Sequence, residues 1–241
     1  MIPHWLERTV LLVGPERLER LIGARVLVVG LGGVGSFAAE FLGRAGIGRL
    51  TLVDGDSVDP TNKNRQLVAL DSTVGLPKTE VMRARLMDIN PELDLHIIAH
   101  FQEPDDMERL IADGYDYVLD CIDSIQPKQL LIETCQRAGV RFISAMGAGG
   151  KTDPERVRIT RMNQTKNCPF AQQIRRTMRR QGHPVDFWVV SSDEETERNS
   201  LRLTDGSRYK KSFYGTISFM PAQFGLLMAA HVIRELMATE P

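Results

Sequence analysis

The residues that most clearly indicate a chemical function form the pattern G-x-G-x-x-G at Gly30, Gly32 and Gly35, with Gly33 as an additional glycine. Glycines allow the backbone to turn tightly and approach a bound phosphate, and the helix that follows presents unpaired N–H groups to an anion. Asp54 lies about 20 residues further on, where an acid can bond a ribose hydroxyl. The pattern is typical of NAD-dependent dehydrogenases and of ATP-using enzymes, and a purely structural turn is a third interpretation.

The polar segment after Asp54 favours ATP over NAD. It contains Asp56, Asn62, Arg65 and, after a V-G-L-P turn, Lys78. Cationic side chains of this kind neutralise the β- and γ-phosphates of ATP and stabilise pyrophosphate as it leaves. NAD has no γ-phosphate, and a dinucleotide-binding fold usually passes sooner into its next helix. The segment therefore indicates an ATP-using enzyme.

Four motifs in combination resemble the ThiF/MoeB/HesA adenylating superfamily, which includes the ubiquitin-activating enzymes. The motifs are GLGGVGS, VDGDSVDPTNKNRQ, VGLPKTEVM and LDCIDS, and the resemblance covers residues 7–150. It implies that the glycine loop, Asp54 and Asp56 hold ATP. It also implies that Asn62, Arg65 and Lys78 contact the phosphates, Arg65 and Lys78 also as catalytic residues.

The resemblance implies two further catalytic residues. Asp123, in the D-x-x-D signature, would coordinate Mg²⁺, a hard cation that commonly lies between a carboxylate and substrate phosphates. The alternative is that Asp123 caps the following helix. Arg8 stands six residues before Gly14, as does the arginine that reaches a neighbouring subunit's site in this superfamily, which implies a homodimer. A solvent-exposed arginine on a first helix is the alternative there.

Three cysteines, Cys121, Cys135 and Cys168, form no C-x-x-C pair, which excludes a zinc ribbon and a thioredoxin-type motif. Cys121 and Cys135 fall in a predicted core strand and core helix, so we expect both to be inert. Cys168, beside Lys166, is either a nucleophile or a packed side chain. Superfamily members that transfer a protein tail often use a catalytic cysteine. A chain without a required thiol suits a substrate that carries its own second nucleophile.

Residues 141–150, 152–159 and 215–221 carry a narrower resemblance, to the branch that dehydrates threonylcarbamoyladenosine in tRNA. It implies an ATP-dependent dehydratase with tRNA as its substrate. One alternative is an adenylyltransferase that activates the C-terminal carboxylate of a sulfur-carrier protein. A nucleotide-binding scaffold without catalysis is another. A sulfur-relay partner protein also remains open.

The net charge of −1 hides a basic segment, because residues 151–211 contain fourteen Lys and Arg but only eight Asp and Glu. Four of these cations form i, i+4 pairs on a predicted helix at 170–181, which places them on adjoining strips. Such a helix suits RNA phosphates, while a solvated helix face is the alternative. The four residues are Arg175, Arg176, Arg179 and Arg180.

These residues need a scaffold, and the sequence predicts one in which apolar strands alternate with helices. Strands at 25–30, 49–54, 93–99, 115–122 and 140–145 alternate with helices at 34–44, 78–90 and 128–137. We therefore expect a doubly wound, mostly parallel, Rossmann-like α/β sheet.

Residues 1–150 would form an ATP-binding adenylation domain, and residues 151–241 a smaller α+β extension, most simply as one continuous domain. The extension would contain strands at 157–162 and 187–191 and a packed terminal helix at 221–237. Residues 193–211 are polar and poor in aromatic residues, which predicts a mobile loop.

The hydrophobic content of 42% and charged content of 25% are ordinary for a soluble globular protein. The first residues lack the basic and apolar blocks of a signal peptide. No apolar run reaches the roughly 20 residues that span a bilayer. We therefore expect a cytoplasmic protein that has no membrane partner.

Overall fold

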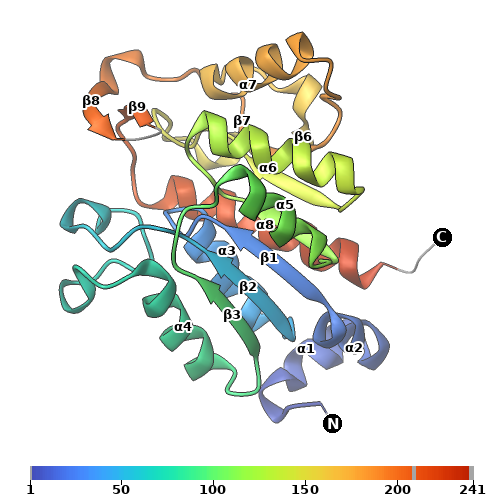
Figure 1. Cartoon of the computed structure of the whole chain (residues 1–241). Helices are drawn as coiled ribbons and strands as arrows, with labels where there is room; N and C mark the ends of the chain where they lie inside the picture. Colours follow the sequence, from blue (N-terminus) through green and yellow to red (C-terminus); the bar gives the residue numbers. More distant parts are fainter. Residues whose placement is uncertain (1, 208–209, 239–241) are drawn as a thin grey trace.

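The computed structural model describes residues 2–207 and 210–238, and a seven-stranded sheet with the order β3-β2-β1-β4-β5-β7-β6 forms its centre (Figure 1). Neighbouring strands are parallel, except that β6 runs antiparallel to β7. This confirms the predicted doubly wound, mostly parallel α/β sheet. The strands are β1 (Arg25–Val29), β2 (Arg49–Val53), β3 (Asp94–Ile98), β4 (Tyr117–Asp120), β5 (Phe142–Ala145), β6 (Val157–Arg161) and β7 (Trp188–Ser192), with a separate hairpin of β8 (Leu201–Ser207) and β9 (Lys210–Tyr214).

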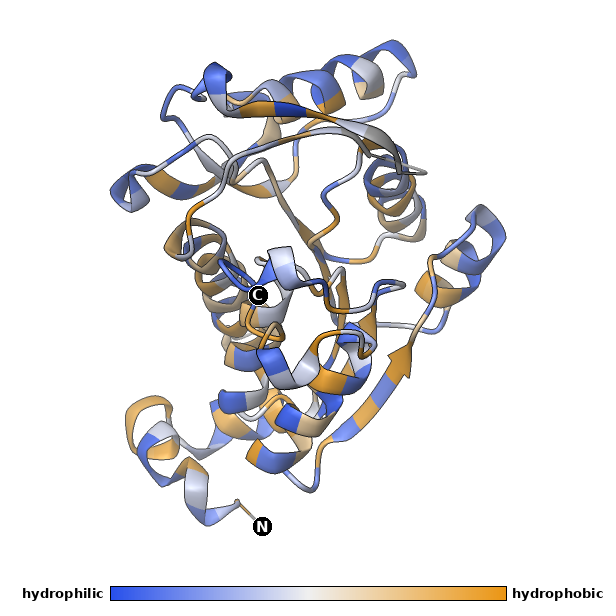
Figure 2. Cartoon of the chain, turned by 90° about the vertical axis from the view of Figure 1, so that its left-hand side faces the viewer, coloured by the Kyte–Doolittle hydropathy of each residue, from blue (hydrophilic) through white to orange (hydrophobic). Residues whose placement is uncertain are grey.

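Helices cover both faces of the sheet. One face packs against α2, α3, α4 and α8, and the other against α5, α6 and α7. Strands β1 and β2 are consequently buried on both sides, which explains their continuous apolar sequences. Figure 2 shows hydrophilic and hydrophobic bands on the helices, as expected when only one helix face packs on a sheet. The helices are α1 (Glu7–Val13), α2 (Pro15–Gly23), α3 (Gly35–Arg44), α4 (Lys78–Ile89), α5 (Pro104–Ala112), α6 (Ile125–Ala138), α7 (Pro169–Arg180) and α8 (Phe219–Met237).

The predicted loop at 193–211 is wrong over much of its length, because the segment contains the hairpin of β8 and β9. Residues 208–209 of that prediction lie outside the described residues. Leu201 and Leu203 alternate with polar residues, which is a strand pattern, but the overall polarity of the segment obscured it. Helix α5 was also absent from the sequence-based prediction.

The C-terminal helix α8 packs closely against α3, the helix that follows the glycine loop. A Cβ atom at Gly225 would lie 2.4 Å from the Val34 carbonyl oxygen and 3.1 Å from the Ala38 nitrogen, so only glycine allows this approach. The predicted terminal helix is therefore a support for the candidate phosphate-binding loop. Within the described part of the chain, no helix is both long and apolar enough to cross a bilayer.

Candidate active site

The predicted nucleotide-binding residues meet at the carboxyl edge of the sheet. Strand β1 lies between β2 and β4, and all three strands are parallel, so the segments that follow them share one edge. The glycine loop follows β1, Asp54 follows β2 and Asp123 comes three residues after the end of β4. In open α/β sheets this edge is where ligands bind.

The glycine loop is shaped by close backbone contacts. Gly30 has a φ of 93°, and a Cβ atom on it would lie 2.8 Å from the Cys121 carbonyl oxygen. A Cβ atom on Gly35 would lie only 1.7 Å from the Gly30 carbonyl oxygen, and one on Gly33 would lie 2.8 Å from Cβ of Pro221. At Gly32 the nearest atom would be 3.7 Å away, on the side chain of Gln66. Three glycines are therefore required by the fold, whereas at Gly32 a Cβ atom would make only an ordinary van der Waals contact.

The Gln66 side chain, whose Nε2 atom would be the nearest neighbour of a Cβ atom at Gly32, also contains an acceptor that is unpaired in the described part of the chain. Gln66 is buried, and among the described residues its Oε1 atom has no hydrogen-bond partner. Unpaired buried polar atoms are uncommon in native structures and often mark a binding site. An unpaired amide oxygen in the side chain that borders Gly32 is consistent with a polar ligand, such as a nucleotide, at this loop.

The carboxylate of Asp54 joins the glycine loop to the loop after β2. Its Oδ2 atom accepts a hydrogen bond from Leu31 N at 2.6 Å, and its Oδ1 atom accepts one from Asp56 N at 2.8 Å. Burial raises the pKa of Asp54, and nearby Lys78 opposes that shift. Each carboxylate oxygen can accept more than one hydrogen bond, so the predicted contact with a ribose hydroxyl remains chemically available.

The predicted phosphate-binding side chains have protein partners. Lys78 is buried and its Nζ lies 2.8 Å from Asp56 Oδ2, so Asp56 orients the lysine. Asn62 is also buried, and its Oδ1 atom accepts a hydrogen bond from Asp59 N at 3.2 Å. Arg65 donates through Nη1 to the Thr61 carbonyl at 3.0 Å. These contacts hold the cationic side chains in place, and a bound phosphate would compete for them.

Asp123 lies in the turn between β4 and α6 and is exposed. The N-cap position of α6 is Ser124 and not Asp123, which weighs against the capping interpretation. Among the described residues no group of three or more His, Cys, Asp or Glu could hold a metal. Magnesium does not require such a group, because it is often held by one or two carboxylates and the substrate's phosphates. The donor set at Asp123 fits that arrangement.

Arg8 is the one predicted site residue that the fold keeps away from this edge. It lies on α1, which precedes α2, and α2 ends just before the amino end of β1 (Figure 1). Arg8 is exposed there. The structure therefore does not bring Arg8 to the glycine loop of its own chain.

The three cysteines are buried or partly buried. Burial strongly raises the pKa of Cys121 and raises that of Cys135 to about 12, so both thiols stay protonated near neutral pH. Cys168 is 7% exposed and its Sγ accepts a hydrogen bond from Ala171 N at 3.5 Å, at the start of α7. These contacts favour the structural interpretation of Cys168.

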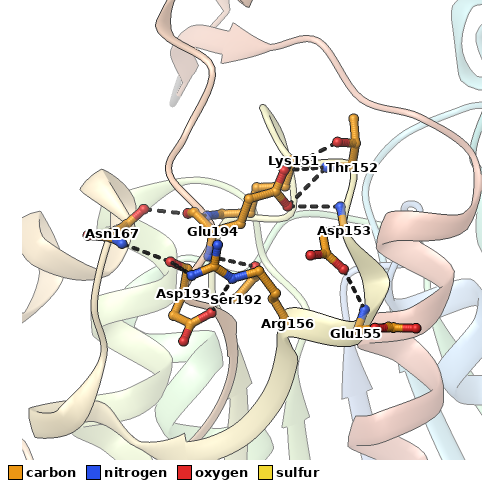
Figure 3. Close-up of polar contacts among 9 residues, drawn as sticks. All are labelled: Lys151, Thr152, Asp153, Glu155, Arg156, Asn167, Ser192, Asp193 and Glu194. Carbon is orange, nitrogen blue, oxygen red and sulfur yellow. Dashed lines mark hydrogen bonds and ion pairs between the residues drawn. The ribbon is translucent and has the colours of Figure 1, made fainter.

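A carboxylate clamp, absent from the sequence-based prediction, fixes the connection that leads to the β8–β9 hairpin (Figure 3). The two carboxylate oxygens of Glu194 accept from Thr152 N and Asp153 N, both at 2.9 Å, and Lys151 Nζ donates to the Glu194 carbonyl oxygen. Burial alone would raise the pKa of Glu194, but these backbone hydrogen bonds outweigh it and hold the pKa below its usual range. No motif could have indicated this contact, because its partners lie some forty residues apart in sequence.

Hydrogen bonds connect the clamp to the segment that carries the predicted phosphate contacts Asn62 and Arg65. Gly150 accepts from Glu197 N and donates to the Gly215 carbonyl, both at 2.8 Å. The next residue, Thr216, accepts a hydrogen bond from Asn64 Nδ2 at 2.9 Å. The base of the hairpin therefore lies against the segment that carries Asn62 and Arg65.

Comparison with known proteins agrees with this arrangement. A family model described as "ThiF family" matches residues 6–241. The chain belongs to the ThiF family. It is 41% identical over 241 residues to the tRNA threonylcarbamoyladenosine dehydratase of Bacillus subtilis, covering 97% of this chain and 95% of the relative. This confirms the resemblance inferred from the four motifs.

Two further comparisons differ in how much of the chain they cover. The crystal structure of Escherichia coli tRNA N6-threonylcarbamoyladenosine dehydratase in complex with ATP matches with a TM-score of 0.88 and 34% identity, covering 98% of this chain and 97% of that one. A molybdopterin-synthase adenylyltransferase of Salmonella typhimurium is 44% identical, but over 129 residues, covering 54% of this chain and 51% of the relative. The likeness to the dehydratases thus includes the C-terminal half.

The two glycines at 32 and 35 give a matched test of the loop. We expect Gly35→Ala to lower the free energy of unfolding by about 3 kcal/mol, because the new Cβ atom collides with a backbone carbonyl. Gly32→Ala should change the free energy of unfolding by less than about 1 kcal/mol, because its methyl group makes no clash, but it should weaken ATP binding, because the methyl group would lie in the loop that approaches the phosphates. Urea unfolding and ATP titration of both variants make the comparison. Equal losses of stability would contradict the assigned roles.

Proposed function

We propose that this protein is an ATP-dependent dehydratase that adenylates the carboxylate of threonylcarbamoyladenosine in tRNA and then closes a ring. The observation that carries the proposal is the nearly full-length likeness to dehydratases of this substrate, one of which has been solved with ATP. The site supports it independently, because the glycine loop and exposed Asp123 follow the neighbouring parallel strands β1 and β4, and buried Lys78 is paired with Asp56 in the segment after β2.

The first step would form an acyl-adenylate. A carboxylate oxygen of the threonyl group attacks the α-phosphorus of ATP, and the bond to the β-phosphate oxygen breaks to release pyrophosphate. Arg65 and Lys78 would stabilise the negative charge that develops on the departing phosphates. A magnesium ion, held by Asp123 and the phosphates, would add positive charge there. Asp56 would keep Lys78 directed at the site through their ion pair.

The second step would need no nucleophile from the enzyme. The carbamoyl group of the same nucleoside attacks the activated carbonyl carbon, loses a proton and expels AMP, which carries away one former carboxylate oxygen. Holding both groups on one bound nucleoside makes ring closure effectively unimolecular. The buried position of Cys168 supports this thiol-independent route.

A sulfur-carrier adenylyltransferase remains the alternative function. The four nucleotide-binding motifs resemble the superfamily as a whole, and a relative of that kind matches 54% of this chain. The C-terminal half, with its basic α7, favours tRNA. A sulfur-relay partner and a cytoplasmic location are further proposals, the latter because a tRNA-modifying enzyme works where tRNA is found.

We also propose a homodimer in which Arg8 serves the neighbouring subunit's site. Helix α1 presents large apolar side chains to solvent, with Leu11 79% and Leu12 85% exposed and Trp5 of the preceding turn 41% exposed. Exposed apolar groups of this size mark interaction surfaces. A second copy that covers this face would bury them and would contact Arg8, which its own chain holds far from its glycine loop.

The exposed face of α7 is the proposed contact for tRNA phosphates. Arg175 is tied to the protein, since its Nη1 donates to the Met162 and Thr165 carbonyls at 3.2 Å each. Arg176, Arg179 and Arg180 are exposed, and none of them has a hydrogen bond or ion pair to another described residue. Together with Gln172, the four arginines line one surface hollow. Unpaired arginines that share one helix face suit a polyanion.

The function is tested by AMP release with three substrates. We expect ATP-dependent release of AMP and pyrophosphate with tRNA that carries threonylcarbamoyladenosine. Neither unmodified tRNA nor a protein with a Gly-Gly tail should support it. Equal rates with the two tRNAs would overturn the dehydratase proposal, and turnover only with the Gly-Gly protein would establish the alternative.

The role of α7 is tested by removing its free charges. The triple variant Arg176→Gln, Arg179→Gln, Arg180→Gln should bind tRNA more weakly, and the slope of log K against log salt should fall by about 2 to 3. ATP binding should not change, because α7 lies outside the glycine loop. The matched control removes three exposed arginines elsewhere, Arg49, Arg83 and Arg109, with the same substitution. Equal tRNA affinity in the two triple variants would contradict the proposed contact.

A further inference from the structure

A fully buried polar cluster lies at the end of β4, next to the turn that carries Asp123. Lys128 and Asp120 both have fully buried side chains, and Lys128 Nζ lies 2.7 Å from Asp120 Oδ2. Ser144 Oγ donates to the same carboxylate oxygen at 2.5 Å and lies 3.0 Å from Lys128 Nζ. We call Asp120, Lys128 and Ser144 the strand-end cluster.

The stability of the fold alone would not favour a buried ion pair at this position over apolar side chains. Removing two charges from water costs several kcal/mol per ion, and the attraction between them offsets this only when the geometry is good. Replacing a buried ion pair by apolar side chains of similar volume is often neutral or stabilising. The core on the α6 side of the sheet is apolar enough for such a replacement, with Val118 and Leu131 buried in it. A local role is therefore a better explanation of these charges than the stability of the fold.

The other carboxylate oxygen of Asp120, Oδ1, holds the turn that follows β4. Asp120 Oδ1 accepts a hydrogen bond from Ile122 N at 3.1 Å, one residue before Asp123. Lys128 reaches the carboxylate from α6, which begins just after this turn, and Ser144 reaches it from β5. The carboxylate is thus fixed from two neighbouring elements while it fixes the turn.

The same turn forms a wall of the glycine loop. Cys121 N donates to the Val29 carbonyl at 2.9 Å, and a Cβ atom at Gly30 would collide with the Cys121 carbonyl oxygen. A shift of the turn would therefore move Asp123 relative to the loop that binds phosphate. The glycine loop and the turn that carries Asp123 therefore meet at the contact between Gly30 and the Cys121 carbonyl.

We propose that the strand-end cluster fixes the position of Asp123 relative to the glycine loop, so that magnesium and nucleotide bind together. Asp120, Lys128 and Ser144 are positioning residues and touch neither ligand. The inference rests on the proposed role of Asp123 and concerns the residues that support it.

Two double variants that differ at one position test the proposal. Both contain Lys128→Met, which removes the lysine charge, and they carry either Asp120→Asn or Asp120→Leu. Asparagine keeps an acceptor for Ile122 N, whereas leucine of similar size does not. Neither variant leaves an unpaired buried charge, so thermal unfolding should find both folded.

The measurement is the binding of a fluorescent ATP analogue as a function of Mg²⁺ concentration. We expect the half-saturating Mg²⁺ concentration to rise about tenfold or more in the leucine variant, the size typical when a group that orients a metal ligand is lost. It should stay within about threefold of the unchanged protein in the asparagine variant. The same half-saturating concentration in both double variants would overturn the proposal.

Two reference variants separate this result from a failure of the underlying function. Asp123→Ala should abolish the Mg²⁺ dependence of nucleotide binding, and unchanged dependence would overturn the metal role and the inference with it. Glu40→Gln weakens a buried carboxylate network with Arg44 and Arg85, which connects α3 and α4 instead of the β4 turn. It should lower the unfolding temperature without changing the Mg²⁺ requirement, and a tenfold change there would show that the readout reports stability and not position.

Discussion

The contact between Gly30 and the Cys121 carbonyl is the constraint on which the site depends. It brings the loop after β1 against the turn after β4, at a separation that leaves no room for a Cβ atom. Because β1 lies between β2 and β4, the same loop is also held from the other side by Asp54. A nucleotide's phosphates, its ribose and a metal would thus be received by segments whose spacing the parallel sheet fixes. Glycine is required here for contact within the protein as much as for contact with a ligand.

The C-terminal half of the chain belongs to this arrangement. Pro221, at the start of α8, lies against Gly33, and Gly225 lets α8 approach the backbone of α3. The Glu194 clamp and the hydrogen bond from Asn64 to Thr216 hold the base of the hairpin beside the segment that carries Asn62 and Arg65. Together these contacts make the C-terminal half a structural neighbour of the candidate nucleotide site, which suits an enzyme that completes two chemical steps on one bound nucleoside.

Much of the fold and of the nucleotide site follows from local sequence patterns. Apolar runs such as 25–30 and 49–54 predicted buried strands, and the motifs named the residues that meet at the sheet edge. The β8–β9 hairpin was missed because its leucines alternate within a polar segment. Sequence also could not show that Asp56 is the ion-pair partner of Lys78, since that contact depends on how the loop folds back. From the sequence, Lys128 was indistinguishable from an ordinary helix residue, and only its contacts with Asp120 and Ser144 show that its charge is buried.

The central claim is that the carboxylate of the tRNA nucleoside is activated by transfer of AMP before the ring closes. The most direct test uses threonylcarbamoyladenosine tRNA with both carboxylate oxygens replaced by ¹⁸O, followed by mass spectrometry of the products. The account predicts one ¹⁸O atom in the released AMP and one in the cyclised nucleoside. Release of AMP without ¹⁸O, or of ADP and labelled phosphate, would contradict it.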